Sequence, residues 1–378
     1  MAFPIDRFQS EPTPFYYYDM ELLRQTLDVV VAQSGKYNFH VHFAVKANAN
    51  PRLLAEINKA GLGIDCVSGY EVECAIQNGF SPEKIVFAGV GKSDWEIRLA
   101  LEAGILCFNV ESIPELEVIN EMASQLGKTA DVALRINPNV DAHTHQYITT
   151  GMEENKFGIG LWEVETVCTR IKQMSNIRLR GIHFHIGSQI TDLSVFQMLC
   201  TRINELQKWF EENKIKLDII NVGGGLGVDY EHPDEKPIAN FEEYFAVFHR
   251  FLELRDGQEV HFELGRAIVA QCGSLITRVL YVKEGQQKKF AIVDAGMNDL
   301  IRPALYHAYH KIENITSDAS SEKYDVVGPV CESSDCFGKA AVLNSTKRGD
   351  LIAIRSAGAY GEVMSSRYNL RRFAGCLV

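Results

Sequence analysis

The sequence lacks the marks of a membrane protein or a secreted protein. No stretch approaches the ~20 consecutive apolar residues that a membrane-spanning helix needs. Residues 1–6 show neither the basic start nor the apolar run of a signal peptide. The nine cysteines are an odd number and form no Cys-x-x-Cys pair, which favours reduced thiols over a disulfide framework or a zinc knuckle. We therefore expect a cytoplasmic protein in which most cysteines are small core residues.

An excess of basic residues is also missing. The net charge is −11 and both signs are mixed along the chain, so the surface should repel nucleic acid and anionic membranes. The 378 residues are many for one domain and sufficient for two, with enough apolar content to bury a core. We therefore expect small molecules or further copies of the chain as partners, and neither nucleic acid nor a membrane.

The first two-thirds of the chain instead contain a repeat of strand and helix. Strand segments rich in Val, Ile or Phe begin near Val41, Gly63, Lys84, Leu106, Asp131, Arg180, Leu217 and Glu259. Amphipathic helical segments lie between them, at residues 51–60, 70–78, 94–103, 114–126, 164–174, 195–213 and 241–254. Eight strands joined by seven helices are what a closed (β/α)₈ barrel of the TIM type requires.

The pattern changes after Arg266. Short strand segments separated by turns follow, at residues 274–282, 289–294, 324–329, 340–343 and 350–355, with one helix expected near 302–310. This predicts a mostly-β C-terminal domain. The strand expected at 13–18 has no place in the barrel and should pair with that domain. We therefore expect a barrel over residues 34–267 and a β domain made of 1–33 and 268–378.

Several barrel strands end in residues that can perform chemistry, and in a parallel barrel these ends converge on one site. In chain order they are Lys46, Asp65, Arg135, His185 with Ser188, the glycine loop 223–227 (GGGLG), and Glu263 with Arg266. The loop suits a bound phosphate, although glycine runs serve tight turns equally well. A lysine beside a phosphate site indicates a Schiff base with pyridoxal phosphate. Glu263 would then hold the pyridine nitrogen, or else form an ordinary ion pair with Arg266.

A metal site is the competing hypothesis for His183 and His185, which share a strand face. The strand ends do not supply the further His, Asp and carboxylate set in the order that metal-dependent barrel hydrolases use. We therefore expect no metal ion in the active site.

Seven motifs occur in order along nearly the whole chain, from residue 13 to about 369. They are 43–48 (FAVKAN), 65–69 (DCVSG), 185–188 (HIGS), 223–227 (GGGLG), 263–266 (ELGR), 331–335 (CESSD) and 357–361 (AGAYG). Together the chain resembles the fold-type III pyridoxal-phosphate decarboxylases. The resemblance implies an alanine-racemase-like barrel, a β domain, and a homodimer with shared active sites. This chain has Leu264 and Ser334 where the family usually has Pro and Gly, and Leu264 leaves the phosphate turn less rigid.

The resemblance also implies roles for individual residues. Lys46 would form the Schiff base and His185 would stack on the cofactor ring. The other implied cofactor contacts are Asp65, Arg135, Ser188, Gly223, Gly224, Gly225, Gly227, Glu263, Leu264, Gly265, Arg266 and Tyr360. Asp65 and Arg135 have an alternative as members of structural ion pairs. The implied substrate contacts are Arg266, Arg302, Tyr306, Glu332 and Tyr360. Cys331 would donate a proton from the opposite subunit, or would otherwise be a small buried thiol.

Within the family the resemblance is strongest to the members that convert meso-2,6-diaminopimelate to L-lysine and carbon dioxide, the last step of lysine biosynthesis. A substrate with a second amino-acid end needs both charges at that end neutralised, which arginines and a glutamate can do. Relatives acting on arginine, ornithine or carboxynorspermidine are the nearest alternatives, but a basic tail would meet Arg302. A racemase would need a second base, and a non-catalytic pyridoxal-phosphate binder would tolerate loss of Lys46, Glu263 or Cys331.

Overall fold

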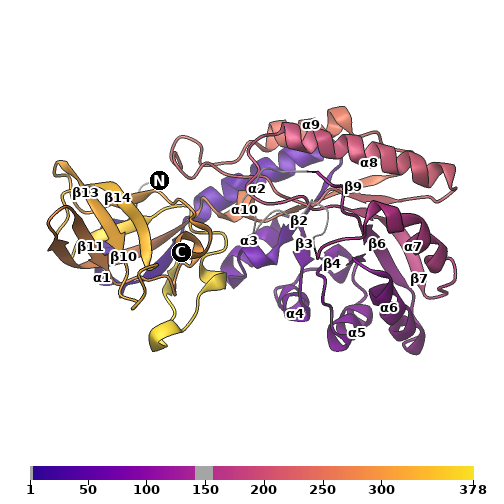
Figure 1. The fold of residues 1–378 in the computed structure, drawn as a ribbon, viewed down its shortest axis with the longest axis horizontal. Coiled ribbons are helices and arrows are strands. Elements are labelled where there is room, and N and C mark those ends of the chain that lie inside the picture. The colour runs from indigo at the N-terminus through magenta and orange to yellow at the C-terminus, as the bar shows by residue number, and fades with distance from the viewer. Residues whose placement is uncertain (1–2, 141–155) are drawn as a thin grey trace. The chain divides into compact units, whose positions relative to one another are not determined.

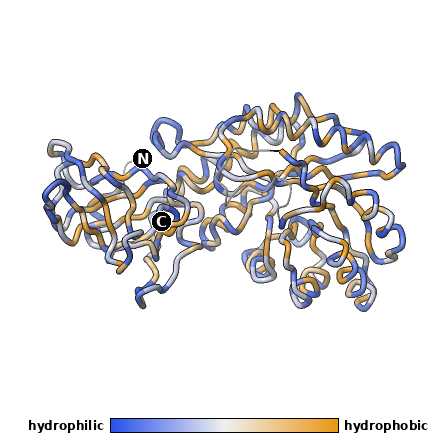
Figure 2. The backbone as a smooth tube through the Cα atoms, viewed as in Figure 1, coloured by the Kyte–Doolittle hydropathy of each residue, from blue (hydrophilic) through white to orange (hydrophobic). Residues whose placement is uncertain are grey.

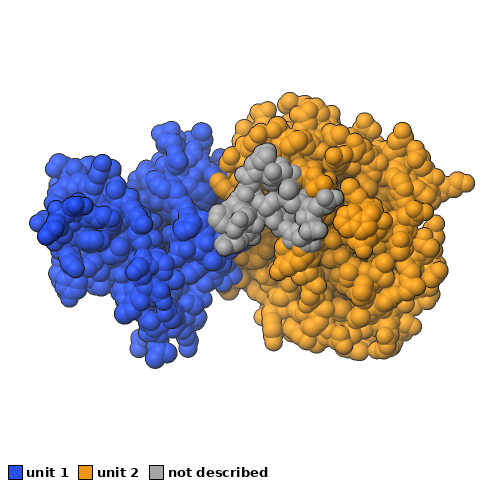
Figure 3. Space-filling model, viewed as in Figure 1, with its two compact units in different colours: residues 1–26, 228–239, 266–378 blue, residues 27–227, 240–265 orange. Residues whose placement is uncertain are grey.

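The computed structural model describes residues 3–140 and 156–378, and the chain folds into two compact units (Figure 3). The barrel unit comprises residues 27–227 and 240–265, and the β unit comprises residues 1–26, 228–239 and 266–378. Among the helices of the described ranges, none is both long enough and apolar enough to cross a bilayer.

The barrel unit contains a closed barrel of eight parallel strands (Figure 1). The strands are β2 (His40–Ala44), β3 (Gly63–Cys66), β4 (Ile85–Phe87), β5 (Cys107–Val110), β6 (Ala130–Arg135), β7 (Ile177–His183), β8 (Ile219–Asn221) and β9 (Glu259–Leu264). The last strand, β9, pairs with the first, β2, and this pairing closes the barrel. The predicted barrel is confirmed, and each strand begins close to its predicted position.

Helices connect the barrel strands as predicted. They are α3 (Pro51–Lys59), α4 (Gly69–Gln77), α5 (Asp94–Ala103), α6 (Ile113–Gln125), α7 (Val164–Ile171), α8 (Ser194–Glu212) and α9 (Phe241–Phe251), with α2 (Met20–Gly35) before the first strand. Hydrophobic and hydrophilic residues alternate along them, as Figure 2 shows. In α6 the Glu115 backbone N–H donates to the Ser112 hydroxyl, which fixes the helix start. In α3 the apolar residues Leu53, Leu54 and Ile57 are buried.

The β unit is built on one mixed sheet. Its strands are β1 (Phe15–Tyr18), β10 (Gly273–Glu284), β11 (Lys289–Val293), β12 (Ile312–Asn314), β13 (Ser321–Val327), β14 (Cys336–Asn344), β15 (Leu351–Ile354) and β16 (Gly375–Leu377). β1 pairs antiparallel with β10, which confirms that the N-terminal strand joins the β domain. Phe15 and Ile276 face each other there in a small apolar core.

Three short helices complete the described elements relevant to the site, α1 (Ile5–Ser10), α10 (Arg266–Val269) and α11 (Arg302–Tyr306). α11 is shorter than the predicted helix at 302–310 because His307 adopts a left-handed conformation with φ of 51° and ends it. All nine cysteines are free, and Cys66, Cys107, Cys168, Cys200 and Cys272 are buried. The predicted absence of a disulfide framework is therefore confirmed.

Candidate active site

Lys46 lies in a single 3₁₀ turn, Val45–Ala47, directly after β2. Its Nζ atom is 3.6 Å from Oδ2 of Asp65, near the end of the neighbouring strand β3. The Asp65 side chain is fully buried, whereas 35% of the Lys46 side chain is exposed. Neither carboxylate oxygen of Asp65 has a hydrogen-bond partner among the described residues. Burial, followed by the charge of Glu263, raises the pKa of Asp65 well above its ordinary value.

Glu263 lies near the end of β9, and three side chains surround its carboxylate. Its Oε1 accepts hydrogen bonds from the side-chain amides of Asn109 (3.0 Å) and Asn221 (2.8 Å), and its Oε2 lies 2.9 Å from Nε2 of His183. Burial alone raises the pKa of Glu263, but His183, through its charge and hydrogen bond, and then Lys46, lower it below the ordinary value. Glu263 is therefore a fixed carboxylate at neutral pH. Three donors leave it capacity for about one more.

His185 follows β7 and is partly exposed. The backbone N–H of Gly224 donates to its Nδ1 over 3.4 Å. Burial, then the charges of Lys46 and Arg135, lowers the pKa of His185 well below its ordinary value. The ring is therefore neutral at pH 7 and offers a flat apolar face.

The glycine loop 223–227 requires glycine for close backbone packing. Gly223 has a φ of 71°, and a Cβ atom on it would lie 2.1 Å from the carbonyl oxygen of Phe184. A Cβ atom on Gly224 would lie 1.9 Å from the carbonyl oxygen of Glu263. The loop thus sits tightly between the ends of β7 and β9. The tight-turn interpretation explains these glycines, and a glycine loop of which Gly225 is partly exposed remains compatible with a phosphate.

The other predicted cofactor residues of the barrel unit also lie at strand ends. Arg135, the last residue of β6, donates to Glu111 over 2.8 Å, so it is a member of a buried ion pair. Ser188 follows β7 and is partly exposed. Leu264 is the last residue of β9 and is buried. Gly265 packs closely on Ala47, where an added Cβ atom would lie 2.8 Å from the alanine side chain.

The β unit holds an arginine cluster, formed by Arg266, Arg302, Tyr230, Tyr306 and Tyr360. Arg266 Nη1 donates to the Tyr230 hydroxyl over 2.6 Å, and its guanidinium carbon lies 4.9 Å from the centre of the Tyr360 ring. The Arg302 guanidinium carbon lies 5.6 Å from the Tyr230 ring centre and 5.8 Å from that of Tyr306. Two cations are thus surrounded by tyrosine rings, an arrangement that stabilises them through cation–π contacts.

Arg302 is buried, with 6% of its surface exposed. Its Nε donates to Nε2 of His310 over 3.3 Å, and the other ring nitrogen of His310 lies 2.8 Å from the Arg355 carbonyl oxygen. Among residues 3–140 and 156–378, no carboxylate lies within ion-pair distance of Arg302. Burial lowers its pKa, but an arginine remains a cation at neutral pH. A buried guanidinium in this state is complementary to a planar carboxylate ligand.

Cys331 and Glu332 lie in a separate, exposed segment of the β unit. The Cys331 N–H donates to Oδ1 of Asn369 over 3.2 Å, and the Tyr368 hydroxyl donates to Glu332 over 2.7 Å. The expected alternative of a small buried thiol is wrong for Cys331, because its side chain is exposed. The structure therefore brings four predicted substrate residues together in the arginine cluster, and it places Glu332 outside that cluster.

Several residues around Glu263 and around the arginine cluster were not predicted from the sequence. Asn109 and Asn221 stand at or near the ends of apolar strands, in CFNV and IIN, and a polar residue in such a strand was an available signal. Tyr230 and His310 come from loops, and no local pattern identified them. His183, considered as half of a metal pair, instead faces Glu263.

Comparison with known proteins establishes the class. Residues 23–270, most of the chain, match the family described as pyridoxal-dependent decarboxylase, pyridoxal binding domain. The chain therefore belongs to the pyridoxal-dependent decarboxylases, which are lyases that use pyridoxal phosphate.

The proteins most relevant to the comparison have a more specific name within this class. The chain is 61% identical over 370 residues to diaminopimelate decarboxylase of Bacteroides thetaiotaomicron, covering 98% of this chain and 96% of that protein. It is 47% identical over 360 residues to diaminopimelate decarboxylase of Pseudomonas aeruginosa, covering 95% and 86%. The solved structure of diaminopimelate decarboxylase from Helicobacter pylori complexed with L-lysine matches with a TM-score of 0.92 and 42% identity, covering 98% of this chain and 92% of that one.

The residues of the barrel unit fit pyridoxal phosphate. The Lys46 amine can bind its aldehyde, and the fixed Glu263 carboxylate has room to accept from a protonated ring nitrogen. Asp65 and His183 Nδ1 are buried polar groups without hydrogen-bond partners in the described chain, as expected where a polar group is to be bound.

Proposed function

We propose that this chain decarboxylates meso-2,6-diaminopimelate to L-lysine, the last step of lysine biosynthesis. The observation that carries the proposal is the 61% identity to a diaminopimelate decarboxylase over 98% of the chain. The buried Arg302, which has no carboxylate partner among the described residues, supports it independently because the substrate has a second carboxylate to offer.

The barrel unit binds the cofactor in this proposal. Lys46 would hold pyridoxal phosphate through its side-chain amine. Glu263 would hold the proton on the ring nitrogen, because its ionised carboxylate is fixed by Asn109, Asn221 and His183. The bound cofactor supplies an electron sink for the bond broken when carbon dioxide leaves. The neutral His185 ring would pack on the cofactor ring, and Asp65 and Arg135 would be further cofactor contacts.

The phosphate group is assigned to a second set of residues. Backbone N–H groups suit an anion, and small residues allow it to approach closely. The assigned residues are Ser188, Gly223, Gly224, Gly225, Gly227, Leu264, Gly265, Arg266 and Tyr360.

The arginine cluster binds the distal end of the substrate. Arg302 and Arg266 attract the distal carboxylate, with the Tyr306 and Tyr360 hydroxyls as further donors. Glu332 neutralises the distal ammonium, for which an exposed carboxylate is suited. Cys331 Sγ donates the proton that replaces carbon dioxide on the substrate carbon.

A homodimer with shared active sites completes the proposal. Cys331 and Glu332 are exposed, which leaves them available to a second copy of the chain. The domains of the proposal are a cofactor-binding barrel over 34–267 and a β domain of 1–33 and 268–378 that supplies substrate and dimer contacts. The cytoplasmic location expected from the sequence belongs to the same proposal.

A substrate panel tests this function. The purified protein with pyridoxal phosphate is incubated separately with meso-diaminopimelate, arginine, ornithine and carboxynorspermidine, and the products are identified by amino-acid analysis. We expect lysine from diaminopimelate and little product from the others, because their basic tails would meet Arg302. Faster turnover of any of the other three would contradict the substrate assignment while leaving the family intact.

A further inference from the structure

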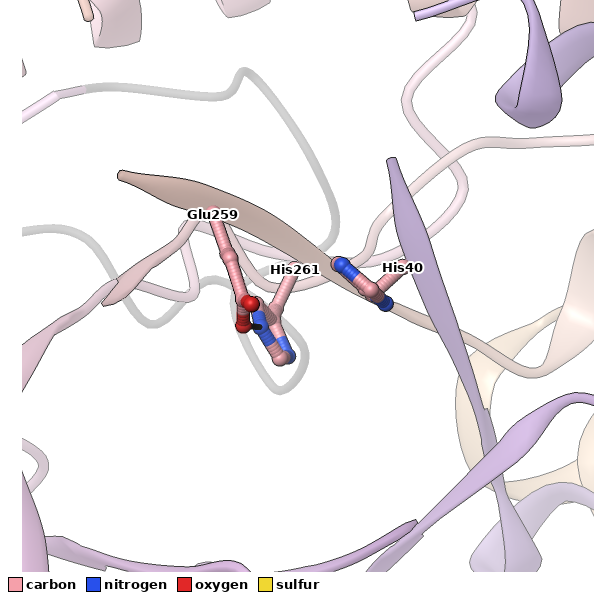
Figure 4. A group of neighbouring side chains, drawn as sticks. All are labelled: His40, Glu259 and His261. Carbon is pink, nitrogen blue, oxygen red and sulfur yellow. Dashed lines mark hydrogen bonds and ion pairs between the residues drawn. The ribbon is translucent and has the colours of Figure 1, made fainter. Parts of the chain in front are cut away.

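A second cluster of polar side chains lies at the opposite end of the barrel, where β2 and β9 begin. His40 is the first residue of β2 and Glu259 the first of β9, and His40 is in register with His261 on the paired strand. Figure 4 shows these three side chains, which we call the seam cluster. One ligand atom of each residue lies within 4.8 Å of the others. His40 and Glu259 are exposed, whereas His261 is buried.

His42 fixes the orientation of His261. Nδ1 of His42 lies 3.1 Å from the Lys84 carbonyl oxygen, which can only accept, so this nitrogen carries the proton. Nε2 of His42 lies 2.8 Å from Nδ1 of His261, so one proton joins these two nitrogens and holds the His261 ring in place. The proton on Nδ1 of His42 is inferred from its hydrogen-bond partner.

The other ring nitrogen of His261, Nε2, lies 3.3 Å from Oε2 of Glu259. A ring nitrogen and a carboxylate oxygen at this distance can be joined by a proton or by a metal ion. The His40 ring stacks on the His261 ring, with ring centres 4.8 Å apart, and one of its nitrogens lies within 4.8 Å of the other two ligand atoms.

We propose that the seam cluster binds a divalent transition-metal ion such as Zn²⁺ through His40, Glu259 and Nε2 of His261. Two imidazoles and one carboxylate with a fourth position open are a known zinc ligand set. His42 supports the site by holding the other nitrogen of a ligand histidine, as such partners do in metal sites. A cavity of about 370 Å³ borders the cluster and gives a water ligand access.

The ligands need only a small adjustment. Tetrahedral Zn²⁺ with bonds of ~2.1 Å places its ligand atoms about 3.4 Å apart, closer than the 4.8 Å limit of the cluster. His40 and Glu259 are exposed and can rotate toward the buried His261. The nearby Lys84 ammonium donates to the Gly61 carbonyl over 2.9 Å.

The bound ion would join the first and last strands of the barrel. Because it binds the folded barrel and not the unfolded chain, it would raise the thermal stability of the protein. This role is independent of the decarboxylase chemistry at the other end of the barrel.

Zinc binding tests the proposal directly. The cofactor-containing protein is treated with a chelator, dialysed against Zn²⁺, and analysed for zinc per chain and for its melting temperature. We expect one added ion and a higher melting temperature, with affinity reduced at least ~10-fold in His40→Ala and in Glu259→Gln. Both positions are exposed, so the variants should fold. His249→Ala, an exposed histidine of the same unit, is the matched control and should bind zinc as the unchanged protein does.

Crystals soaked in Zn²⁺ locate the ion by its anomalous scattering, which we expect beside Nε2 of His261. The proposal is overturned if the unchanged protein binds no zinc, if either variant keeps the original affinity, or if the ion lies only elsewhere. In those cases the contact between His261 and Glu259 is a hydrogen bond only.

Discussion

Glu263 is buried and charged at the same time, and its hydrogen-bond partners explain why the charge is tolerated. Two amides and an imidazole supply three hydrogen bonds, which replace the water that the carboxylate loses. The strand-end position made Glu263 predictable from sequence, because the last residues of an apolar strand identify it locally. Its partners on β5, β7 and β8 come from distant parts of the chain, so only the closed barrel reveals them.

Glu263→Gln should keep the cofactor but lower kcat by on the order of 100-fold or more. A neutral amide cannot hold a proton on the ring nitrogen, and this charge matters most in the transition state. Cofactor content from absorbance and kcat from lysine release measure the two effects separately. Glu242→Gln, at an exposed position of α9, is the control. An unchanged kcat in Glu263→Gln would remove Glu263 from the chemistry.

Arg302→Ala should raise KM for diaminopimelate by at least about 30-fold, while cofactor content stays the same. Removing one partner of a buried charged contact costs about 2–5 kcal/mol, because the substrate carboxylate is then left unpaired. Arg348→Ala is the matched control, since Arg348 also stacks on a tyrosine, Tyr281, but is exposed. Equal losses of substrate and cofactor binding in Arg302→Ala would indicate a structural role.

The strands and helices of the barrel were predictable because their hydrophobic periodicity is strong and each is bounded by turn residues. β12 and β16 were missed because each has three residues and lies outside the strand–helix repeat that identified the equally short β4 and β8. The excursion of residues 228–239 into the β unit was also invisible in the sequence. It brings Tyr230 to the arginine cluster through tertiary contacts that no local signal encodes.

The glycine loop is the element whose sequence the fold constrains most tightly. Gly224→Ala should lower the free energy of unfolding by about 1–3 kcal/mol or more, because its Cβ atom would lie 1.9 Å from the Glu263 carbonyl oxygen. Urea denaturation followed by circular dichroism measures the change. Gly91→Ala serves as the control, since an added Cβ there meets nothing within 4 Å. Equal stability of the two variants would show that the loop is not tightly packed.

The whole molecule divides its candidate residues between two units, with the Lys46 group in one and the arginine cluster in the other. The sequence predicted both sets, because its motifs span both units.

Subunit exchange tests the shared site. Lys46→Ala and Cys331→Ala proteins should each be inactive, and mixing them under exchange conditions should restore roughly a quarter of the original activity. Random exchange makes about half of the dimers mixed, and each mixed dimer has one of its two sites intact. Activity after mixing is compared with each variant alone. No recovery, with exchange confirmed independently, would mean that Cys331 does not act across a dimer.

Borohydride reduction followed by mass spectrometry tests whether the cofactor is attached to Lys46. The protein is isolated with its pyridoxal phosphate, reduced with borohydride to fix the cofactor covalently, digested, and analysed by mass spectrometry. We expect the adduct on the peptide containing Lys46 and the loss of this adduct in Lys46→Ala. An adduct on a different lysine, or none, would contradict the attachment to Lys46.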